Sequence, residues 1–124
     1  MPSQANVTGT WMLQVTFHDG PMQGQVEQAK IVFQSDRDNT CLVLLPDTGT
    51  GKWEAKGPSE FSYELTEILN YEPGGYFGRY VKVEHQGTLT ADGTFSSAGT
   101  GEVYQADGTF ILTTHTTAVA TRVS

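Results

Sequence analysis

Two polar residues, Glu67 and His85, interrupt faces of the sequence that are otherwise apolar. In the stretch FSYELTEIL, residues 61–69, alternate residues of an extended chain point to the same side. Glu67 therefore shares its side with large apolar groups: Phe61, Tyr63, Leu65 and Leu69. A carboxyl group in an apolar cavity is suited to acid–base chemistry or to accepting a ligand's hydroxyl. The alternative is that Glu67 reaches solvent at the rim of the fold, or pairs with Arg79 or Lys82.

His85 has a similar setting on a later strand. It shares a side with Val81, Val83 and Leu89, and the expected strand register places it opposite Tyr63. One interpretation is a core imidazole that is hydrogen-bonded to Tyr63. The other is a donor or general base that faces a ligand, because histidine titrates near neutral pH.

Glu27 is a third polar residue on an apolar side, which it shares with Ala29, Ile31 and Phe33. It follows the first turn closely, so we expect it nearer the rim than the centre. The large residues that share these inward sides, and would shape any cavity, are Trp11, Phe33, Trp53, Phe61, Tyr63 and Leu65.

Other familiar site chemistries do not match the sequence. His18, His85 and His115 lie far apart without the spacing of metal ligands, so no metal site is predicted. The PDTGTGKW segment lacks the full spacing of a phosphate-binding loop and the helix that would follow it. No strained turn carries the serine of a Ser-His-Asp site. We therefore expect a protein that works without a metal or cofactor.

Composition limits the class of protein and its partners. The 124 residues suffice for one domain, and we expect residues 1–124 to form it. A net charge of −7 with scattered basic residues argues against nucleic acid. No signal peptide and no apolar run of about 18 residues is found, which predicts a cytoplasmic protein outside the membrane. Cys41, in the apolar run CLVLLP, is expected in the core rather than at a reactive site.

The elements that position these residues are all predicted to be β-strands. Alternation with a period of two runs along almost the whole chain, and no window has the spacing of an amphipathic helix. Seven turn signals separate eight strands, at 9–18, 25–34, 40–46, 51–57, 60–71, 77–90, 94–104 and 109–122. The short connections make neighbours antiparallel. Closing the first strand on the last removes both edges and gives an all-β, eight-stranded, antiparallel up-and-down barrel.

Matching residues across each turn predicts the register of the strands. The predicted pairs are Phe17–Glu27, Trp11–Phe33, Val43–Ala55, Trp53–Tyr63 and Leu89–Phe95. This register keeps the inner face mostly apolar through seven strands. The eighth strand is ambiguous, because two similar ADGTF turns require a change of face in the seventh strand. The segment Gly99-Thr100-Gly101 suits a bulge there, and His115 is left pointing either way.

The segment Gly9-Thr10-Trp11 at the start of the first strand, with Arg122 near the end of the last, resembles the signature of lipocalin-like barrels of the calycin superfamily. That resemblance implies that Arg122 packs across Trp11 and closes one end of the barrel. The Thr8–Trp11 segment also resembles the start of avidins, without their Trp-rich biotin-binding segments. The plan is similar to small bacterial barrels from polyketide gene clusters, several of which are cyclases, including pericyclases.

An eight-stranded barrel is wide enough either to be packed solid or to hold one small ligand. We expect a hydrophobic, polyketide-like molecule inside it, and we expect the protein to promote that molecule's cyclisation or isomerisation by orienting it. Glu67 and His85 would polarise the ligand or transfer a proton. The alternative is a carrier that leaves its ligand unchanged. A third interpretation is a structural or dimer-forming domain, favoured if no cavity of at least roughly 300 Å³ exists.

The longest loop, within NYEPGGYFGRY, is expected at the open end of the barrel. Its aromatic residues suit a lid or a contact between two copies of the chain, because exposed aromatic groups seldom cluster without a partner. Ordinary packing at the end of a hairpin is the alternative. These residues are Tyr71, Tyr76, Phe77 and Tyr80.

Overall fold

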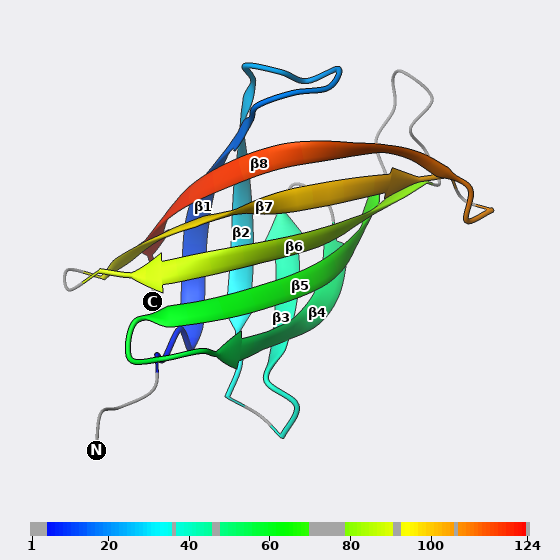
Figure 1. The fold of residues 1–124 in the computed structure, drawn as a ribbon. Helices are drawn as coiled ribbons and strands as arrows, with labels where there is room; N and C mark the ends of the chain where they lie inside the picture. Colours follow the sequence, from blue (N-terminus) through cyan, green and yellow to red (C-terminus); the bar gives the residue numbers. More distant parts are fainter. Residues whose placement is uncertain are drawn as a thin grey trace.

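The computed structural model describes residues 5–35, 37–45, 48–69, 79–90, 93–105 and 107–123. Its eight antiparallel strands follow one another around a closed barrel (Figure 1). The strands are β1 (Gly9–Phe17), β2 (Val26–Phe33), β3 (Thr40–Leu45), β4 (Thr48–Ala55), β5 (Glu60–Leu69), β6 (Arg79–Leu89), β7 (Thr94–Tyr104) and β8 (Phe110–Arg122). The predicted fold class is confirmed.

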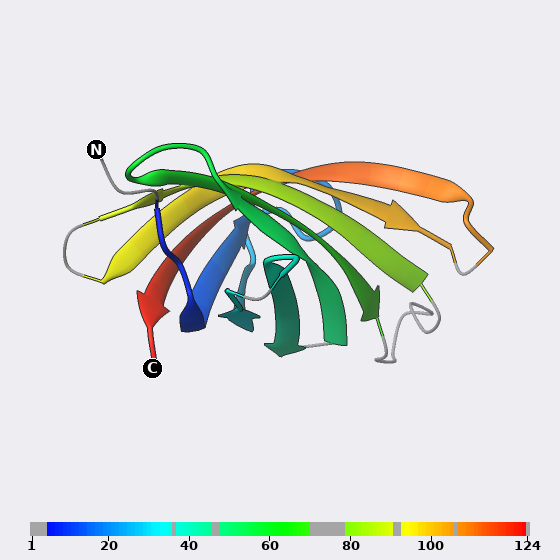
Figure 2. The same cartoon turned by 90° about the horizontal axis from the view of Figure 1, so that it is seen from below.

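The barrel closes where β1 pairs with β8, and the start of β1 lies beside the end of β8 (Figure 2). Pairing along this seam runs from Trp11 with Arg122 to Phe17 with Thr116. Closure leaves no strand edge unpaired, which removes the usual template for edge-to-edge aggregation. No helix in the described part of the chain is long and apolar enough to cross a membrane.

The predicted strand boundaries hold to within three residues, and β4 differs most. It begins at Thr48 rather than residue 51, because Gly49 and Gly51 belong to the sheet and not to a turn. A Cβ atom on Gly51 would lie 1.9 Å from the carbonyl oxygen of Glu64 on β5. Glycine at this position therefore allows the two strands to approach closely.

The predicted register is correct in the middle of the barrel and wrong at two hairpins. Trp53–Tyr63 and Leu89–Phe95 are paired as predicted, as are Tyr63 and His85. The wrong pairs are Phe17–Glu27, Trp11–Phe33 and Val43–Ala55; the structure pairs Val15 with Glu27, Trp11 with Ile31 and Val43 with Gly49.

Main-chain bonds between residues 17 and 25 explain the first error. Phe17 N–H donates to Gln25 O and Gly24 N–H donates to Phe17 O, which closes the first hairpin one residue earlier on each strand than predicted. The pairing therefore slips by two residues. Because side chains alternate with a period of two, an even slip leaves every residue on its predicted face.

The bulge predicted at Gly99-Thr100-Gly101 is also wrong. Gly99 and Gly101 pair in regular register with Thr116 and Thr114. The register shift between β7 and β8 lies at Val103/Tyr104 instead. This placement decides the ambiguity of the last strand: Thr114 and Thr116 are buried, and His115 is exposed on the outside.

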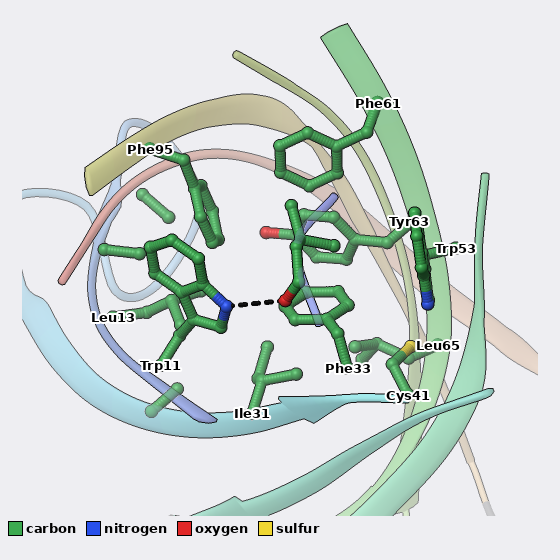
Figure 3. Close-up of a cluster of buried hydrophobic side chains, with 14 of the residues drawn as sticks. Trp11, Leu13, Ile31, Phe33, Cys41, Trp53, Phe61, Tyr63, Leu65 and Phe95 are labelled. Atoms are coloured by element: carbon green, nitrogen blue, oxygen red, sulfur yellow. Dashed lines mark hydrogen bonds between the residues drawn. The ribbon is translucent and has the colours of Figure 1, made fainter. Parts of the chain in front are cut away.

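Large aromatic side chains fill the end of the barrel near the termini, which we call the closed half (Figure 3). The ring of Phe95 lies 4.8 Å from that of Trp11, 5.1 Å from Phe61 and 6.2 Å from Phe33, measured between centroids. The Arg122 guanidinium lies 4.4 Å from the centre of the Trp11 ring, the contact that the sequence signature implied. Trp11 Nε1 donates to Val7 O at 2.8 Å (dashed line in Figure 3).

Cys41 belongs to the same core and is fully buried. Burial raises the pKa of its thiol to about 12, so the sulfur stays protonated and unreactive at neutral pH. Its predicted place in the core is confirmed.

Candidate functional site

A cavity of about 120 Å³ lies inside the other end of the barrel, which we call the open half. Its walls come from β1, β2, β5, β6, β7 and β8, and Met22 from the β1–β2 connection also lines it. The lining is mainly aliphatic. This volume is smaller than the roughly 300 Å³ of an ordinary ligand pocket, so the size criterion stated from the sequence favours a structural or dimer-forming domain over a barrel that encloses a whole drug-sized ligand. The volume nevertheless approaches the roughly 150 Å³ of an apolar cavity that binds benzene in another protein.

The cavity exists because inward side chains become smaller along the barrel. Trp11, Phe33, Phe61 and Phe95 fill the closed half completely. Toward the open end the inward positions carry small groups, among them Val15, Ala29, Val83, Gly101 and Thr114. A barrel of fixed strand number has a nearly constant radius, so smaller side chains leave space along its axis.

A buried polar cluster lies between the two halves, centred on His85, which is 2 % exposed. His85 Nδ1 lies 2.8 Å from Ser97 Oγ and 3.1 Å from Tyr63 Oη, and these two oxygens are 2.9 Å apart. On the other side of the ring, Nε2 lies 2.7 Å from Thr116 Oγ1. Each ring nitrogen therefore has a hydroxyl partner.

Burial sets the protonation state of this cluster. It lowers the pKa of His85 to about 4, so the imidazole is neutral at physiological pH. Burial also raises the pKa of the Tyr63 phenol, which keeps its proton. The cluster is consequently a set of neutral donors and acceptors.

Two carboxylates, those of Glu27 and Glu67, line the wall of the cavity and are half-buried. Glu67 pairs with Gly49 and Val81 two residues before β5 ends, and Glu27 is the second residue of β2. Both strand ends lie at the open end. The carboxylates therefore sit near the mouth, where a ligand would enter.

The structure divides the residues singled out from the sequence into two groups. Glu27, Tyr63, Leu65, Glu67 and His85 meet around the cavity. The other four lie outside its lining, in the closed half or beside it, and pack against other side chains: Trp11, Phe33, Trp53 and Phe61. The Trp53 indole N–H donates to Gln34 O at 2.9 Å, which satisfies its polar atom.

Sequence reasoning missed Thr114, Thr116 and Ser97 as inward polar groups. The segment TTHTT has the same polarity on both faces, so the face of β8 could not be read from this segment. The neighbouring apolar residues give no sequence signal, because the larger one, Val119, is exposed; only in the structure are Ala118 and Ala120, on the face of Thr114 and Thr116, found to be buried.

His115 points outward and ties the β1–β2 connection to β8. Its main-chain N–H donates to Asp19 Oδ1 at 2.8 Å, and its Nδ1 lies 2.7 Å from Asp19 Oδ2. The main-chain bond is the first of the contacts that lower the pKa of Asp19. His18 Nε2 also contacts Thr117 Oγ1 at 2.8 Å. These bonds fasten the connection that carries Met22 to the cavity.

Larger hollows also lie on the outside of the sheet. The one over β4, β5, β6 and β7 has a volume of about 440 Å³ and is walled by outward side chains, including Lys52, Glu64 and Lys82. Its lining mixes these charged side chains with threonines and other residues of the sheet, and it is open to solvent, so it does not enclose a ligand. In the described part of the chain, no three His, Cys, Asp or Glu residues are grouped to hold a metal ion.

Comparison with protein-family models and with curated proteins finds no match to this chain. Any functional assignment to this chain therefore depends on the geometry of the barrel. Of the aromatic loop singled out from the sequence, Tyr71, Tyr76 and Phe77 lie outside the described residues. Tyr80 is described, and its ring stacks on that of Tyr104 at 5.1 Å, on the outside of the barrel.

Proposed function

We propose that the barrel binds a hydrophobic small molecule in the open half and carries it unchanged. The observation that carries this proposal is the cavity itself, an aliphatic space of about 120 Å³ that reaches the open end. A space of this size suits one ring-sized group. A larger ligand, such as the polyketide-like molecule expected from the sequence, would bury one ring and extend through the mouth.

The state of His85 favours carriage over catalysis. A general base works best when its pKa lies near the working pH. The pKa of His85 is lowered to about 4 by burial, and both of its ring nitrogens are engaged with hydroxyl groups. His85 is therefore suited to a structural role, in which its hydrogen bonds hold Tyr63, Ser97 and Thr116 in position beside the cavity.

Conversion of the ligand by cyclisation or isomerisation is the second candidate function. The carboxyl group of Glu67 on the cavity wall supports it, because such a group can polarise a bound molecule or move a proton. This activity needs no cofactor, since orientation alone can supply several kcal/mol.

Binding is tested with cyclohexane-sized probes on a variant whose cavity is filled. Ala29→Leu adds three carbons to the cavity wall and should abolish probe-induced NMR shifts of cavity residues. The matched control is Ala98→Leu, which makes the same change at an exposed position of β7 and should bind as the wild type does. Equal binding by both variants would show that the probe sits elsewhere.

Carriage and conversion are separated with the natural ligand. Native mass spectrometry of gently purified protein, followed by extraction, supplies the bound molecule. Glu67→Gln should leave carriage nearly unchanged, whereas proton-transfer turnover should fall by about 100-fold or more. A turnover rate for the extracted molecule that drops in this way would replace the carrier assignment with the catalytic one.

A further inference from the structure

Two threonine hydroxyl groups on β8 retain hydrogen-bonding capacity that the described protein does not use. Thr114 and Thr116 both line the cavity and are each 7 % exposed. Within the described residues, Thr116 Oγ1 bonds only to His85, and Thr114 Oγ1 bonds to none. A hydroxyl group has one donor hydrogen and two acceptor lone pairs. Both side chains can therefore bond a ligand.

The Thr114 hydroxyl is directed inward. A Cβ atom built on the inward-facing Gly101 would lie 3.4 Å from Thr114 Oγ1. The methyl group of Thr114 lies instead toward the β1–β2 connection, 3.2 Å from a Cβ atom built on Gly20. The oxygen thus belongs to the cavity side of β8.

The contacts around the His85 ring bear on which ring nitrogen carries the proton. Nδ1, Ser97 Oγ and Tyr63 Oη form a triangle with all three sides within hydrogen-bonding distance. If Nδ1 carried the proton, one of the two hydroxyl hydrogens would have no acceptor within the triangle. If Nδ1 carries no proton, its lone pair can accept a hydrogen bond: Tyr63 Oη–H donates to Ser97 Oγ, and Ser97 Oγ–H donates to Nδ1. Either tautomer leaves one hydroxyl hydrogen without an acceptor among these side chains: that of Tyr63 or Ser97 if the proton is on Nδ1, and that of Thr116 if it is on Nε2. We place the proton on Nε2, because Thr116 lines the cavity and is the most exposed of the three hydroxyl residues, at 7 % against 6 % for Ser97 and 3 % for Tyr63.

A proton on Nε2 fixes the role of Thr116. Nε2–H donates to Thr116 Oγ1 across 2.7 Å, so the oxygen of Thr116 acts as acceptor there. The hydroxyl hydrogen of Thr116 is then available for a group in the cavity. His85 acts as a positioning residue, because it turns the threonine hydroxyl into a donor toward the cavity.

We propose that the ligand is a neutral, ring-sized apolar molecule with a carbonyl oxygen, and that Thr116 donates a hydrogen bond to that oxygen with Thr114 beside it. This inference rests on the proposed binding function and narrows its ligand class. Water could accept from the same hydroxyls in an empty barrel, so an oxygen-bearing ligand displaces it without losing hydrogen bonds. Among the described residues that line the cavity, none is a lysine or arginine that could pair with an anionic ligand, which favours a neutral carbonyl over a carboxylic acid.

The test compares cyclohexanone with methylenecyclohexane, which has the same shape but carries a CH₂ group in place of the oxygen. Dissociation constants are measured by NMR titration for the wild type, Thr116→Val and Thr114→Val. Losing one hydrogen bond should weaken cyclohexanone binding by about tenfold in Thr116→Val. Methylenecyclohexane affinity should stay within about twofold, because valine preserves the shape of threonine.

Two controls keep the test decisive. Thr113→Val makes the same change on the outer face of β8 and should alter neither probe. Thr116→Val leaves His85 Nε2–H without its partner, so this variant can lose stability. If it does not fold, Thr114→Val takes its place, because that change removes a hydroxyl that bonds to no described residue; cyclohexanone binding should weaken selectively there as well.

The tautomer of His85 tests its positioning role directly. Nitrogen-15 shifts of the imidazole should show Nε2–H in the free protein and in the cyclohexanone complex, and a proton on Nδ1 would overturn the donor role of Thr116. Equal weakening of both probes, or unchanged cyclohexanone binding in the valine variants, would overturn the carbonyl assignment while leaving the binding function intact. If neither probe binds the wild type, the binding function itself fails, and this inference fails with it.

Discussion

The closed and open halves of the barrel are built from the same strands but have different interiors. In the closed half, aromatic rings meet one another at centroid distances of about 5 to 6 Å, as between Phe95 and Phe61 at 5.1 Å and between Phe33 and Phe61 at 6.2 Å. In the open half, aliphatic side chains and glycine surround about 120 Å³ of space. The difference indicates that the closed half mainly stabilises the fold, whereas the open half has space for a ligand.

The largest expected effect comes from deleting a ring in the closed half. Phe95 is 1 % exposed and contacts four other aromatic rings. Phe95→Ala should lower the free energy of unfolding by about 3–5 kcal/mol, because the cavity it leaves cannot collapse. Val81→Ala, at the existing cavity, should cost about 1 kcal/mol. Urea denaturation followed by circular dichroism measures both, and equal losses would contradict the division into two halves.

The polar cluster between the halves should make stability depend on pH. The pKa of His85 is lowered to about 4 in the folded protein, so folded His85 stays neutral while unfolded His85 takes up a proton below about pH 6.5. Stability should therefore fall as the pH drops from about 6.5 to about 4, by on the order of 3 kcal/mol in total.

His85→Gln isolates this contribution. The variant should lose most of that pH dependence in urea titrations at pH 7 and pH 4.5. His18→Gln changes an exposed histidine and should keep the full dependence. If both variants follow the wild-type curve, the loss of stability at low pH arises from other groups, and the buried polar cluster around His85 is not its source.

A smaller effect is expected where Arg122 closes the barrel. Its guanidinium lies over Trp11 and donates to Thr8 O. Arg122→Gln should cost about 0.5–1 kcal/mol, the usual value of an exposed cation–π contact. Arg37→Gln, at an exposed position between β2 and β3, is the control and should cost almost nothing. Thermal unfolding would compare the two, and matching midpoints would mean that the aromatic core closes this end without the arginine.

At the open end we expect the smallest effect on stability. The effect expected there is on the rate at which a bound probe dissociates. Asp19→Asn weakens the bonds that hold the β1–β2 connection to His115, and this connection carries Met22 to the cavity. A bound ring-sized probe should then leave several-fold faster, because the connection opens more often. NMR exchange measurements would detect the change. Asp38→Asn, on an exposed connection between β2 and β3, should leave the exchange rate unaltered.

Much of the fold could be predicted from the sequence because its signals are local. Alternation and turn residues located all eight strands, and Trp53, Tyr63 and His85 were placed in one row across β4, β5 and β6 as the structure has them. The errors arose at two hairpins, where turn residues reveal that a turn is present but not how many residues it contains. The register of β1 against β2 slipped by two, since the length of a turn depends on its main-chain bonds.

The candidate site was predicted only in part, for a related reason. Glu27, Glu67 and His85 could be recognised because each is a polar residue on an apolar face. Thr114 and Thr116 could not, because β8 carries threonine on both faces and its register depends on a shift at Val103/Tyr104. The sequence assigned four large residues to the correct inner face: Trp11, Phe33, Trp53 and Phe61. Knowing the inner face does not tell where along the barrel axis the packed core ends and the cavity begins.

Local patterns along the chain established the class of fold and the inward face of seven strands. These follow from side-chain alternation and from short connections, which act between near neighbours in the chain. How the interior is shared between packed side chains and empty space emerges only in the folded barrel. That division depends on which side chains from all eight strands meet at each level of the barrel, and those residues are far apart in the sequence.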